Sequence, residues 1–295
     1  MPFIVGAPRS GTTMLRFMLD AHTELAIPPE TGFFTAIDRV VAQNVAQRGD
    51  DAGRRAHFFD TLTHAPPEAP GWGDFGLDAD GFRAALEAIE PFEVGEGFRT
   101  FYRLYAARFG KSRWGDKTPL HCMHVEAIAR VMPEAHFIHV IRDGRDVALS
   151  LREMWFSPGP EIETQAAFWK LCVSTARAQG ARCAHYMEVR FEELVRNATA
   201  VLERICEFID LPLSAAMARY YEGVPERLRE HRERVDTQGR VVVSRATRLH
   251  QQAQTTQPPQ SSRALAWRGS MSADEQRRFA HVAGAMLDEL GYPMA

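Results

Sequence analysis

The sequence predicts an α/β fold in which a parallel sheet is flanked by helices. Two stretches carry this prediction, residues 3–19 and 135–150, because each reads as an apolar strand, a polar turn and the start of a helix. Helical and strand patterns alternate elsewhere, which favours crossover connections between parallel strands. With 295 residues, 45% of them hydrophobic, the chain can bury a large core, and we expect residues 1–295 to form a single domain.

Composition narrows the class of protein before any motif is considered. The net charge of −3 argues against bulk electrostatic binding of nucleic acid. The longest apolar runs fall far short of the roughly 18 residues that a membrane span needs. Because the first strand pattern begins at residue 3, we expect no signal peptide and a cytoplasmic location. The four cysteines lack metal-ligand spacing, so we predict neither disulfides nor a metal site.

The strand at residues 3–5 leads into the loop GAPRSGTT, residues 6–13, and a helix over residues 14–21. Loop N–H groups and the helix N-terminus face one point, where a phosphate can bind. The glycine spacing is that of a Walker A loop, which makes the predicted sheet P-loop-containing, but Thr12 replaces the lysine. Such a loop suits a 5′-phosphate with one transferable group, and an ordinary turn is the alternative. The predicted ligands are Arg9, Ser10, Gly11, Thr12 and Thr13.

A carboxylate follows the next short strand pattern. Residues 25–27 are apolar, and a double proline at residues 28–29 ends the strand. Glu30 comes next, roughly twenty residues after the phosphate loop, where open α/β folds place groups that face a ligand. We therefore predict that Glu30 lies in the site. The alternative is that it is the first-turn acid of a helix over residues 33–47.

A loop-rich helical insertion is expected from about residue 49 to 115. Its apolar spacing predicts helices over residues 82–89 and 98–109. Insertions of this kind commonly carry substrate-contacting surface, and Trp72 and Phe75 are candidates for an apolar wall or for packing under a loop. Lys117 follows in a turn-rich piece, ahead of a predicted helix over residues 120–131.

The second strand end lies at residues 135–141, the clearest strand pattern in the chain. Arg142 follows at its carboxyl end, and Ser150 lies about two turns into the next helix. A guanidinium and a hydroxyl so placed can bind one phosphate. Pairing of Arg142 with Asp143 or Asp146 is the alternative. Two phosphate-binding strand ends in one sheet imply a ligand with two separated phosphates, such as a nucleoside 3′,5′-bisphosphate.

The remaining segments continue the α/β pattern. Residues 217–235 are densely charged and are predicted to be a helix with a solvated face. Residues from about 244 to 263 are rich in Gln, Thr, Ser and Pro, and we expect a mobile loop or lid there. Ser272 and Glu275 predict a capping box. Further helices are predicted at residues 163–182, 199–209 and 273–290, and a strand at residues 185–191.

Together these motifs resemble the sulfotransferase family that uses 3′-phosphoadenosine 5′-phosphosulfate, PAPS. GAPRSGTT is similar to the family's 5′-phosphosulfate loop, and RDGRDVALS at residues 142–150 is similar to its 3′-phosphate motif. WGDKTP at residues 114–119 and the pair Trp267 and Arg268 add support. The resemblance implies a sulfotransferase-like fold, PAPS as co-substrate without a metal, sulfuryl transfer to a hydroxyl, and Arg268 as a further donor contact. The resemblance also makes a homodimer plausible, although no stretch of the sequence identifies an interface.

Within that family, PRSGTTMLRFMLDAH followed by Pro-Glu-Thr is similar to the tyrosylprotein sulfotransferase branch. The resemblance implies Glu30 as catalytic base and Lys117 as a contact of the transferring sulfuryl group. Many cytosolic relatives use a histidine base instead, so further candidates for the base are His57, His64 and His121. Gly32 replaces a basic residue of that branch. We therefore expect a hydroxyl-bearing small molecule as acceptor, with peptide tyrosine as the less expected choice.

Two other functions are left open. A P-loop kinase of a small molecule would need a loop lysine and an acidic Mg²⁺ ligand, which the motifs lack. A catalytically inactive nucleotide-binding scaffold is disfavoured by the presence of Glu30, Lys117 and Arg142. If Glu30 is the base, it works best when partial burial raises its pKa toward neutrality or when the acceptor is a relatively acidic phenol.

Overall fold

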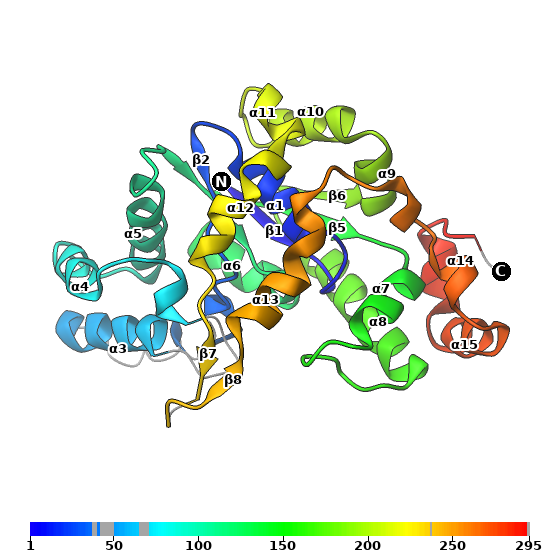
Figure 1. Ribbon diagram of the computed structural model, residues 1–295. Helices are drawn as coiled ribbons and strands as arrows, with labels where there is room; N and C mark the ends of the chain where they lie inside the picture. Colours follow the sequence, from blue (N-terminus) through cyan, green and yellow to red (C-terminus); the bar gives the residue numbers. More distant parts are fainter. Residues whose placement is uncertain (37–39, 42–49, 65–70, 237, 294–295) are drawn as a thin grey trace.

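A computed structural model describes residues 1–36, 40–41, 50–64, 71–236 and 238–293 (Figure 1). Within these residues, a four-stranded sheet lies at the centre of the fold. Every neighbouring pair in it is parallel, which confirms the predicted α/β class. In spatial order the strands are β4 (Asp116–Lys117), β1 (Pro2–Val5), β5 (His136–Ile141) and β6 (Tyr186–Arg190).

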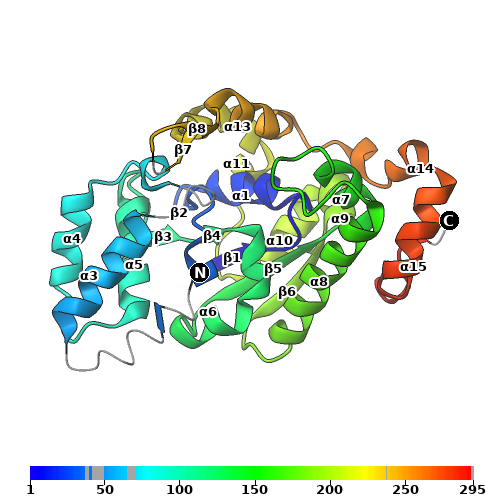
Figure 2. The same cartoon turned by 90° about the horizontal axis from the view of Figure 1, so that it is seen from below.

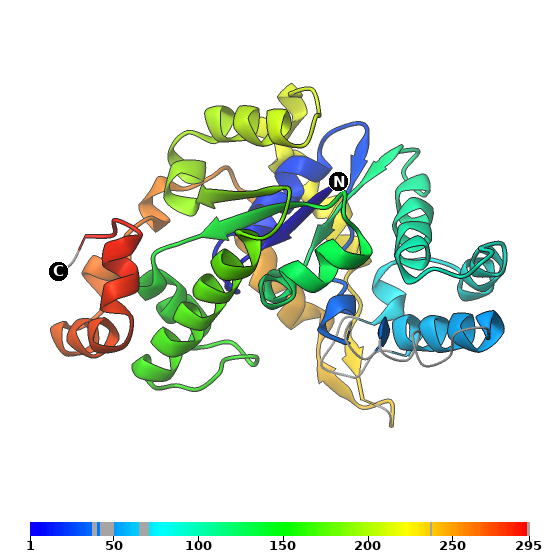
Figure 3. The same ribbon diagram turned by 180° about the vertical axis from the view of Figure 1, so that it is seen from behind.

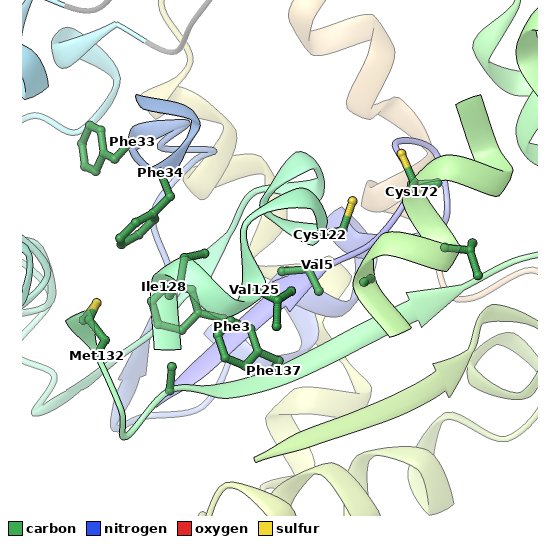
Figure 4. Packing of buried hydrophobic residues seen from close by; sticks show 14 of the residues in the cluster. Phe3, Val5, Phe33, Phe34, Cys122, Val125, Ile128, Met132, Phe137 and Cys172 are labelled. Atoms are coloured by element: carbon green, nitrogen blue, oxygen red, sulfur yellow. The ribbon is translucent and has the colours of Figure 1, made fainter. Parts of the chain in front are cut away.

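Both faces of the sheet are buried, and alternate residues of β1 supply two different cores. Phe3 and Val5 pack with Phe137 on one face, while Ile4 packs with Leu15 on the other. Side chains of a strand alternate in this way, and burial on both sides explains the continuous apolar runs of β1 and β5. Figure 4 shows the side chains of Phe3, Val5 and Phe137 beside those of helix α6.

Helices cover the two faces of the sheet. Figure 3 shows the green helices α6 and α8 in front of the strands, and α1 lies on the opposite face. These helices and their neighbours match the predicted elements closely, except that residues 119–123 form a 3-10 turn ahead of α6. Their bounds are α1 (Thr12–Asp20), α6 (Val125–Val131), α7 (Gly144–Leu151), α8 (Ile162–Gly180), α9 (Phe191–Arg196) and α10 (Ala198–Phe208).

The insertion forms a helical group beside the β4 edge, seen at the left of Figure 2. It contains α3 (Asp51–Thr63), α4 (Ala79–Glu87) and α5 (Val94–Ala107), which confirms the two helices predicted there. Phe75 is fully buried against Phe33 and Phe101, so it packs a core and forms no pocket wall. Of the predicted helix at residues 33–47, Phe33–Ala36 is a 3-10 turn. Most of the rest lies outside the described residues.

The short strand expected at residues 25–27 is present as β2 (Leu25–Ala26), whereas the strands β3 (Arg113–Trp114) and β4 were not predicted. β2 pairs in parallel with β3, and β4 follows two residues later beside β1. Strands of two residues are too short to show a period. Their pairing nevertheless brings Lys117, at the end of β4, next to the phosphate loop at the end of β1.

The charged segment at residues 217–235 differs from its prediction. Instead of one helix it contains α11 (Ala215–Ala218), α12 (Val224–Arg227), 3-10 turns and strand β7 (Arg234–Val235). The predicted solvated face is also wrong, because the Glu230 side chain is only 10% exposed and pairs with Arg16. Glu230 and Arg227 are neutralised by Arg16 and Asp20 from the start of the chain, whereas Glu226 and Arg229 are exposed and pair with each other.

The segment at 244–263 contains more regular structure than expected. β8 (Val241–Val243) pairs with β7, and α13 (Arg245–Gln252) follows it. Figure 2 shows α13 on the side of α1 that faces away from the sheet. A segment without regular structure was therefore the wrong expectation, while its mobility stays a prediction.

The chain ends with α14 (Trp267–Ser270) and α15 (Ala273–Glu289), and α15 begins with the predicted capping box of Ser272 and Glu275. None of the helices in the described residues has the length and apolar character that crossing a bilayer requires.

Candidate active site

A cavity of about 460 Å³ opens where β1, β4 and β5 end. Ligands of open α/β sheets bind at this edge, beyond the carboxyl ends of the strands. The loop after β1, Lys117 at the end of β4 and Arg142 after β5 all line the cavity. The structure thus brings the two predicted strand ends together in one site.

The loop after β1 leaves the N-terminus of α1 facing the cavity. Gly11 is the N-cap, in the left-handed region with φ 95°, and no side chain caps the helix. A Cβ at Gly11 would lie 2.4 Å from Cδ2 of Phe191, so glycine is required by both conformation and space. Uncapped N–H groups of a helix N-terminus are suited to an anion. Arg9, Thr12 and Thr13 line the cavity with Gly11.

Arg9 links the two strand ends directly. Its Nε donates to Oγ of Ser150 at 3.0 Å, and its carbonyl oxygen accepts a hydrogen bond from Arg142 at 3.1 Å. Arg142 also donates to the carbonyl oxygen of Arg263 at 2.9 Å, and its guanidinium lies 4.5 Å from the ring centroid of Phe191. Among the described residues, Nε of Arg142 has no hydrogen-bond partner.

The charges of this group are poorly compensated. Burial lowers the pKa of Arg9, and the neighbouring Arg263 and Arg142 lower it further. Burial also lowers the pKa of Arg142, although Asp146 opposes the shift from 3.6 Å away. The pairing of Arg142 with Asp146, raised as an alternative, is therefore present. Glu192 and Asp143 also oppose the shift of the Arg142 pKa, and Glu30 opposes that of Arg9, but burial and the neighbouring guanidinium groups outweigh these carboxylates. An anionic ligand would relieve the repulsion among these guanidinium groups.

Glu30 and Lys117 form the second part of the site. Lys117 Nζ lies 2.6 Å from Oε1 of Glu30 and donates to Oγ1 of Thr13 at 3.1 Å. The Lys117 side chain is only 3% exposed, whereas that of Glu30 is 38% exposed and reaches into the cavity. The predicted base and the predicted sulfuryl contact are thus adjacent, at the first turn of α1.

The pKa of Glu30 differs from the expectation of a raised value. Burial works to raise the pKa of Glu30, but the Lys117 ammonium, together with Arg234 and Arg248, outweighs burial, and the pKa lies below its ordinary value. Burial lowers the pKa of Lys117, against the opposing effect of the carboxylate. The pair holds Glu30 as a carboxylate, which can accept a proton but is a weak base while the ammonium remains in contact.

A buried network holds the backbone on either side of this pair. Asp116 accepts hydrogen bonds from Oγ1 of Thr31 at 2.7 Å and from the Tyr102 hydroxyl at 2.9 Å. Its other oxygen lies 2.9 Å from Nδ1 of His121. Because Thr31 follows Glu30 and Asp116 precedes Lys117, the network fixes both functional side chains.

The candidate histidines do not reach the site. His121 is fully buried on Asp116, and His57 and His64 lie on and after α3. None of the three lines the cavity. Ser10 is buried behind the loop, and Arg268 is exposed with its guanidinium 5.7 Å from the Trp267 ring centroid.

Several cavity residues were missed by sequence reasoning, and four of them matter for the charge of the site. Arg263 lies five residues before Arg268 and takes the place in the site that Arg268 was predicted to have. The others come from the charged segment and from α13, where a dense run of charges gave no signal of burial. The four are His231, Arg234, Arg248 and Arg263. Among the described residues, no three His, Cys, Asp or Glu side chains gather as metal ligands would, and the absence of a metal stays a prediction.

Comparisons with known proteins agree with this geometry. A family model described as the sulfotransferase family matches residues 3–215. The chain is 27% identical to protein-tyrosine sulfotransferase 1 of Danio rerio, over 98% of this chain and 71% of that protein.

Solved structures share the fold. The sulfotransferase domain of the Synechococcus PCC 7002 olefin synthase superposes with a TM-score of 0.62 at 20% identity, covering 100% of this chain and 95% of that one. The sulfotransferase domain from the curacin biosynthetic pathway gives 0.60 at 19% identity, covering 100% and 98%. These identities are low, so the likeness concerns the fold.

Proposed function

This chain belongs to the sulfotransferase family and is a sulfotransferase enzyme, and we propose that PAPS is its donor and a hydroxyl compound its acceptor. One observation carries the choice of donor: two anion-binding strand ends share a single cavity and are linked through Arg9. A nucleotide phosphorylated at both the 3′ and 5′ positions matches two such sites.

The 5′-phosphosulfate would lie at the N-terminus of α1, against the loop N–H groups, Thr12 and Thr13. The 3′-phosphate would lie against Arg142, Ser150 and Arg263, where a bidentate guanidinium contact is available. We call this part of the cavity the donor end, formed by Arg9, Gly11, Thr12, Thr13, Arg142, Ser150 and Arg263.

The opposite part contains the proposed base. The charges of Lys117, Arg234 and Arg248 lower the pKa of Glu30, and the same three cations lower the pKa of His231. These shared neighbours group Glu30 and His231 together. We call this part the acceptor end, formed by Glu30, His231, Arg234 and Arg248, with Lys117 between the two ends.

In the proposed reaction the acceptor oxygen attacks sulfur in line with the leaving phosphate oxygen. Negative charge develops on that oxygen, and the loop N–H groups, Arg9 and Lys117 are fixed donors that stabilise it. The S–O bond to the phosphate breaks as the new S–O bond forms. The proton of the acceptor hydroxyl passes to Glu30.

The contact between Lys117 and Glu30 suggests how the base is activated. A sulfuryl oxygen competes with Glu30 for the Lys117 ammonium. When Lys117 turns toward the sulfuryl group, Glu30 loses the contact that keeps its pKa low, and burial then raises that pKa. The carboxylate becomes a stronger base only once the donor is bound.

Several features stay predictions. A small-molecule hydroxyl remains the expected acceptor, ahead of peptide tyrosine, and the cytoplasmic location and a possible homodimer are untested. The kinase alternative is disfavoured because Thr12 stands where a Walker lysine would reach the phosphates.

The test combines transfer and binding. Wild type should transfer sulfuryl from PAPS to at least one compound in a panel of phenols, alcohols, sugars and tyrosine peptides, read by mass spectrometry. Glu30→Gln should lower kcat by about 100-fold or more and still bind adenosine 3′,5′-bisphosphate. The exposed Glu24→Gln is the matched control. Normal turnover of Glu30→Gln would remove Glu30 as base, and ATP-dependent transfer in place of PAPS-dependent transfer would overturn the donor.

A further inference from the structure

The acceptor end contains a histidine that the proposed transfer does not use. His231 follows the 3-10 helix Leu228–Glu230, lines the same cavity as Glu30 and Lys117, and is 7% exposed. A buried polar ring at a cavity wall can contact whatever occupies that cavity.

The backbone around His231 is held from both sides. Glu230 accepts a hydrogen bond from the Tyr105 hydroxyl at 2.8 Å and pairs with Arg16 at 3.5 Å. Arg232, on the other side, donates its N–H to Oδ1 of Asp74 at 2.9 Å. These contacts reach two separate parts of the fold, the insertion, through α5 and Asp74, and α1, so distant segments fix the position of His231.

The ring itself is also oriented. A nitrogen of the Arg248 guanidinium lies 3.3 Å from Nδ1 of His231. Arg248 is in turn bound by both carboxylate oxygens of the buried Asp74, at 2.9 and 2.6 Å. A guanidinium has donors and no acceptor, so Nδ1 must accept and the ring proton sits on Nε2. The hydrogen bonds that the described residues make with this ring involve Nδ1 alone.

The surroundings keep the ring neutral. Burial, and then the charges of Arg248 on α13, Arg16 on α1, Lys117 on β4 and Arg234 on β7, lower the pKa of His231 to about 2. A protonated imidazole is excluded near neutral pH, and a base so weak cannot compete with Glu30. What remains is a neutral N–H donor.

The same end of the cavity has an apolar wall. Trp155 and Phe156 line it and are 44% and 37% exposed. The Arg234 guanidinium, which acts on Glu30, lies 5.3 Å from the ring centroid of Trp155. An acceptor with an apolar body could pack on this wall within the cavity that the His231 ring also lines.

We propose that His231 determines acceptor specificity: its Nε2–H binds an oxygen atom that neighbours the hydroxyl to be sulfated. This inference rests on the proposed function and names its substrate class, an apolar hydroxyl compound with an ether or carbonyl oxygen beside the hydroxyl. A site built to hydrogen-bond such an oxygen discriminates against the analogue that lacks it, because the donor is then left unpaired.

The test uses two phenols of nearly equal shape, 2-methoxyphenol and 2-ethylphenol, which differ by an oxygen in place of a methylene. Wild type should favour 2-methoxyphenol by about tenfold, both in kcat/KM with PAPS and in Kd for the complex with adenosine 3′,5′-bisphosphate. His231→Phe keeps a ring without the N–H, and the ratio should fall to about one, chiefly through KM. His231→Gln retains a side-chain N–H and should recover part of the preference.

A wild-type ratio near one, or a preference that persists in His231→Phe, would overturn this inference. The Kd arm needs no turnover, so it decides the role of His231 even if neither phenol is sulfated. Failure of PAPS-dependent transfer to every acceptor in the panel is a separate result, and it would overturn the proposed function instead. Binding of adenosine 3′,5′-bisphosphate within about twofold of wild type verifies that both variants are folded.

Discussion

The donor end and the acceptor end of the cavity are assembled in different ways. Except for Arg263, donor-end residues follow β1 and β5 within about nine residues, so a strand, a turn and the start of the next helix place them. Acceptor-end residues come from the loop after β2, from β7 and from α13, and Asp74 of the insertion supports them. Most of the donor end thus comes from two segments that are each local in sequence, whereas each acceptor-end residue comes from a different segment of the fold.

The two ends also differ in how their charge is compensated. At the donor end, Arg263 and Arg142 lower the pKa of Arg9, Asp146 pairs with Arg142 at 3.6 Å, and Nε of Arg142 has no hydrogen-bond partner among the described residues. At the acceptor end, Arg248 is neutralised by Asp74, and nearby Arg16 pairs with Glu230. The donor end is therefore suited to a multiply charged ligand, and the acceptor end to a less charged one.

The substitution with the largest expected effect disrupts the donor end and leaves the acceptor end intact. Gly11→Ala should weaken binding of adenosine 3′,5′-bisphosphate about 100-fold, because the new Cβ would collide with Phe191, on which Arg142 lies. Isothermal titration calorimetry measures this. Gly269→Ala is the control, since no atom lies within 4 Å of its added Cβ. Wild-type affinity in Gly11→Ala would contradict the required backbone at this position.

The next prediction concerns Lys117, between the two ends. Lys117→Met should lower kcat about 100-fold, since one fixed donor to the developing charge is lost. Without the ammonium, burial raises the pKa of Glu30, so the acidic limb of the kcat profile should move to higher pH. A stopped-time assay from pH 4 to pH 9 shows both effects. The exposed Lys170→Met serves as control, and an unmoved acidic limb would mean that Lys117 does not set the pKa of Glu30.

A third prediction sharpens the boundary of the donor end. Arg263→Ala should weaken binding of the bisphosphate about tenfold or more, and binding of adenosine 5′-phosphate far less, because Arg263 faces the 3′-phosphate site. Arg268→Ala, five residues away and exposed, should change neither. Calorimetric titration of both ligands decides between them. A larger loss for Arg268→Ala would restore the sequence-based assignment.

The smallest expected effect belongs to the acceptor end. His231 has a folded pKa of about 2, against an ordinary value of 6.5, so the unfolded state binds the extra proton as pH falls below 6.5. Stability contributed by the neutral ring is then lost on acidification, by about 1.4 kcal/mol per pH unit. Urea unfolding between pH 7 and pH 5 should show a shallower slope for His231→Gln than for wild type.

The exposed His64→Gln is the control for this measurement and should keep the wild-type slope. His139, with a pKa of about 3, contributes a second slope of the same sign in all three proteins. Identical slopes in wild type and His231→Gln would mean that His231 is not held neutral.

The same contrast explains how much the sequence could predict. The phosphate loop, Arg142 and Ser150 were readable because a strand, a turn and a helix start follow one another within a few residues. Glu30 was predicted from its place after a strand and two prolines. Hydrophobic periodicity also predicted the main helices and β5 within a few residues of their observed ends.

The charged segment was misread for a physical reason. A run such as ERLREHRERV has the composition of a solvated surface, and nothing local distinguishes it from a buried ion-pair network. Glu230 is neutralised by Arg16, and Arg227 by Asp20, both more than 200 residues away. The wrong assignment of Arg268 has the same origin. The packing of the segment before Trp267 decides that Arg263, and not Arg268, lines the cavity.

The mutual contacts of Arg9 and its neighbours have a consequence for nucleotide recognition. One residue anchors both strand ends, through its side chain to Ser150 and through its carbonyl oxygen to Arg142. The two proposed phosphate sites follow adjacent strands, β1 and β5, so the spacing of these strands, roughly 4.8 Å, helps to set the distance between the sites. Isomeric bisphosphates carry the same charge and differ only in the span between their phosphates. If both proposed phosphate sites are occupied, we expect the protein to discriminate between such isomers by that span.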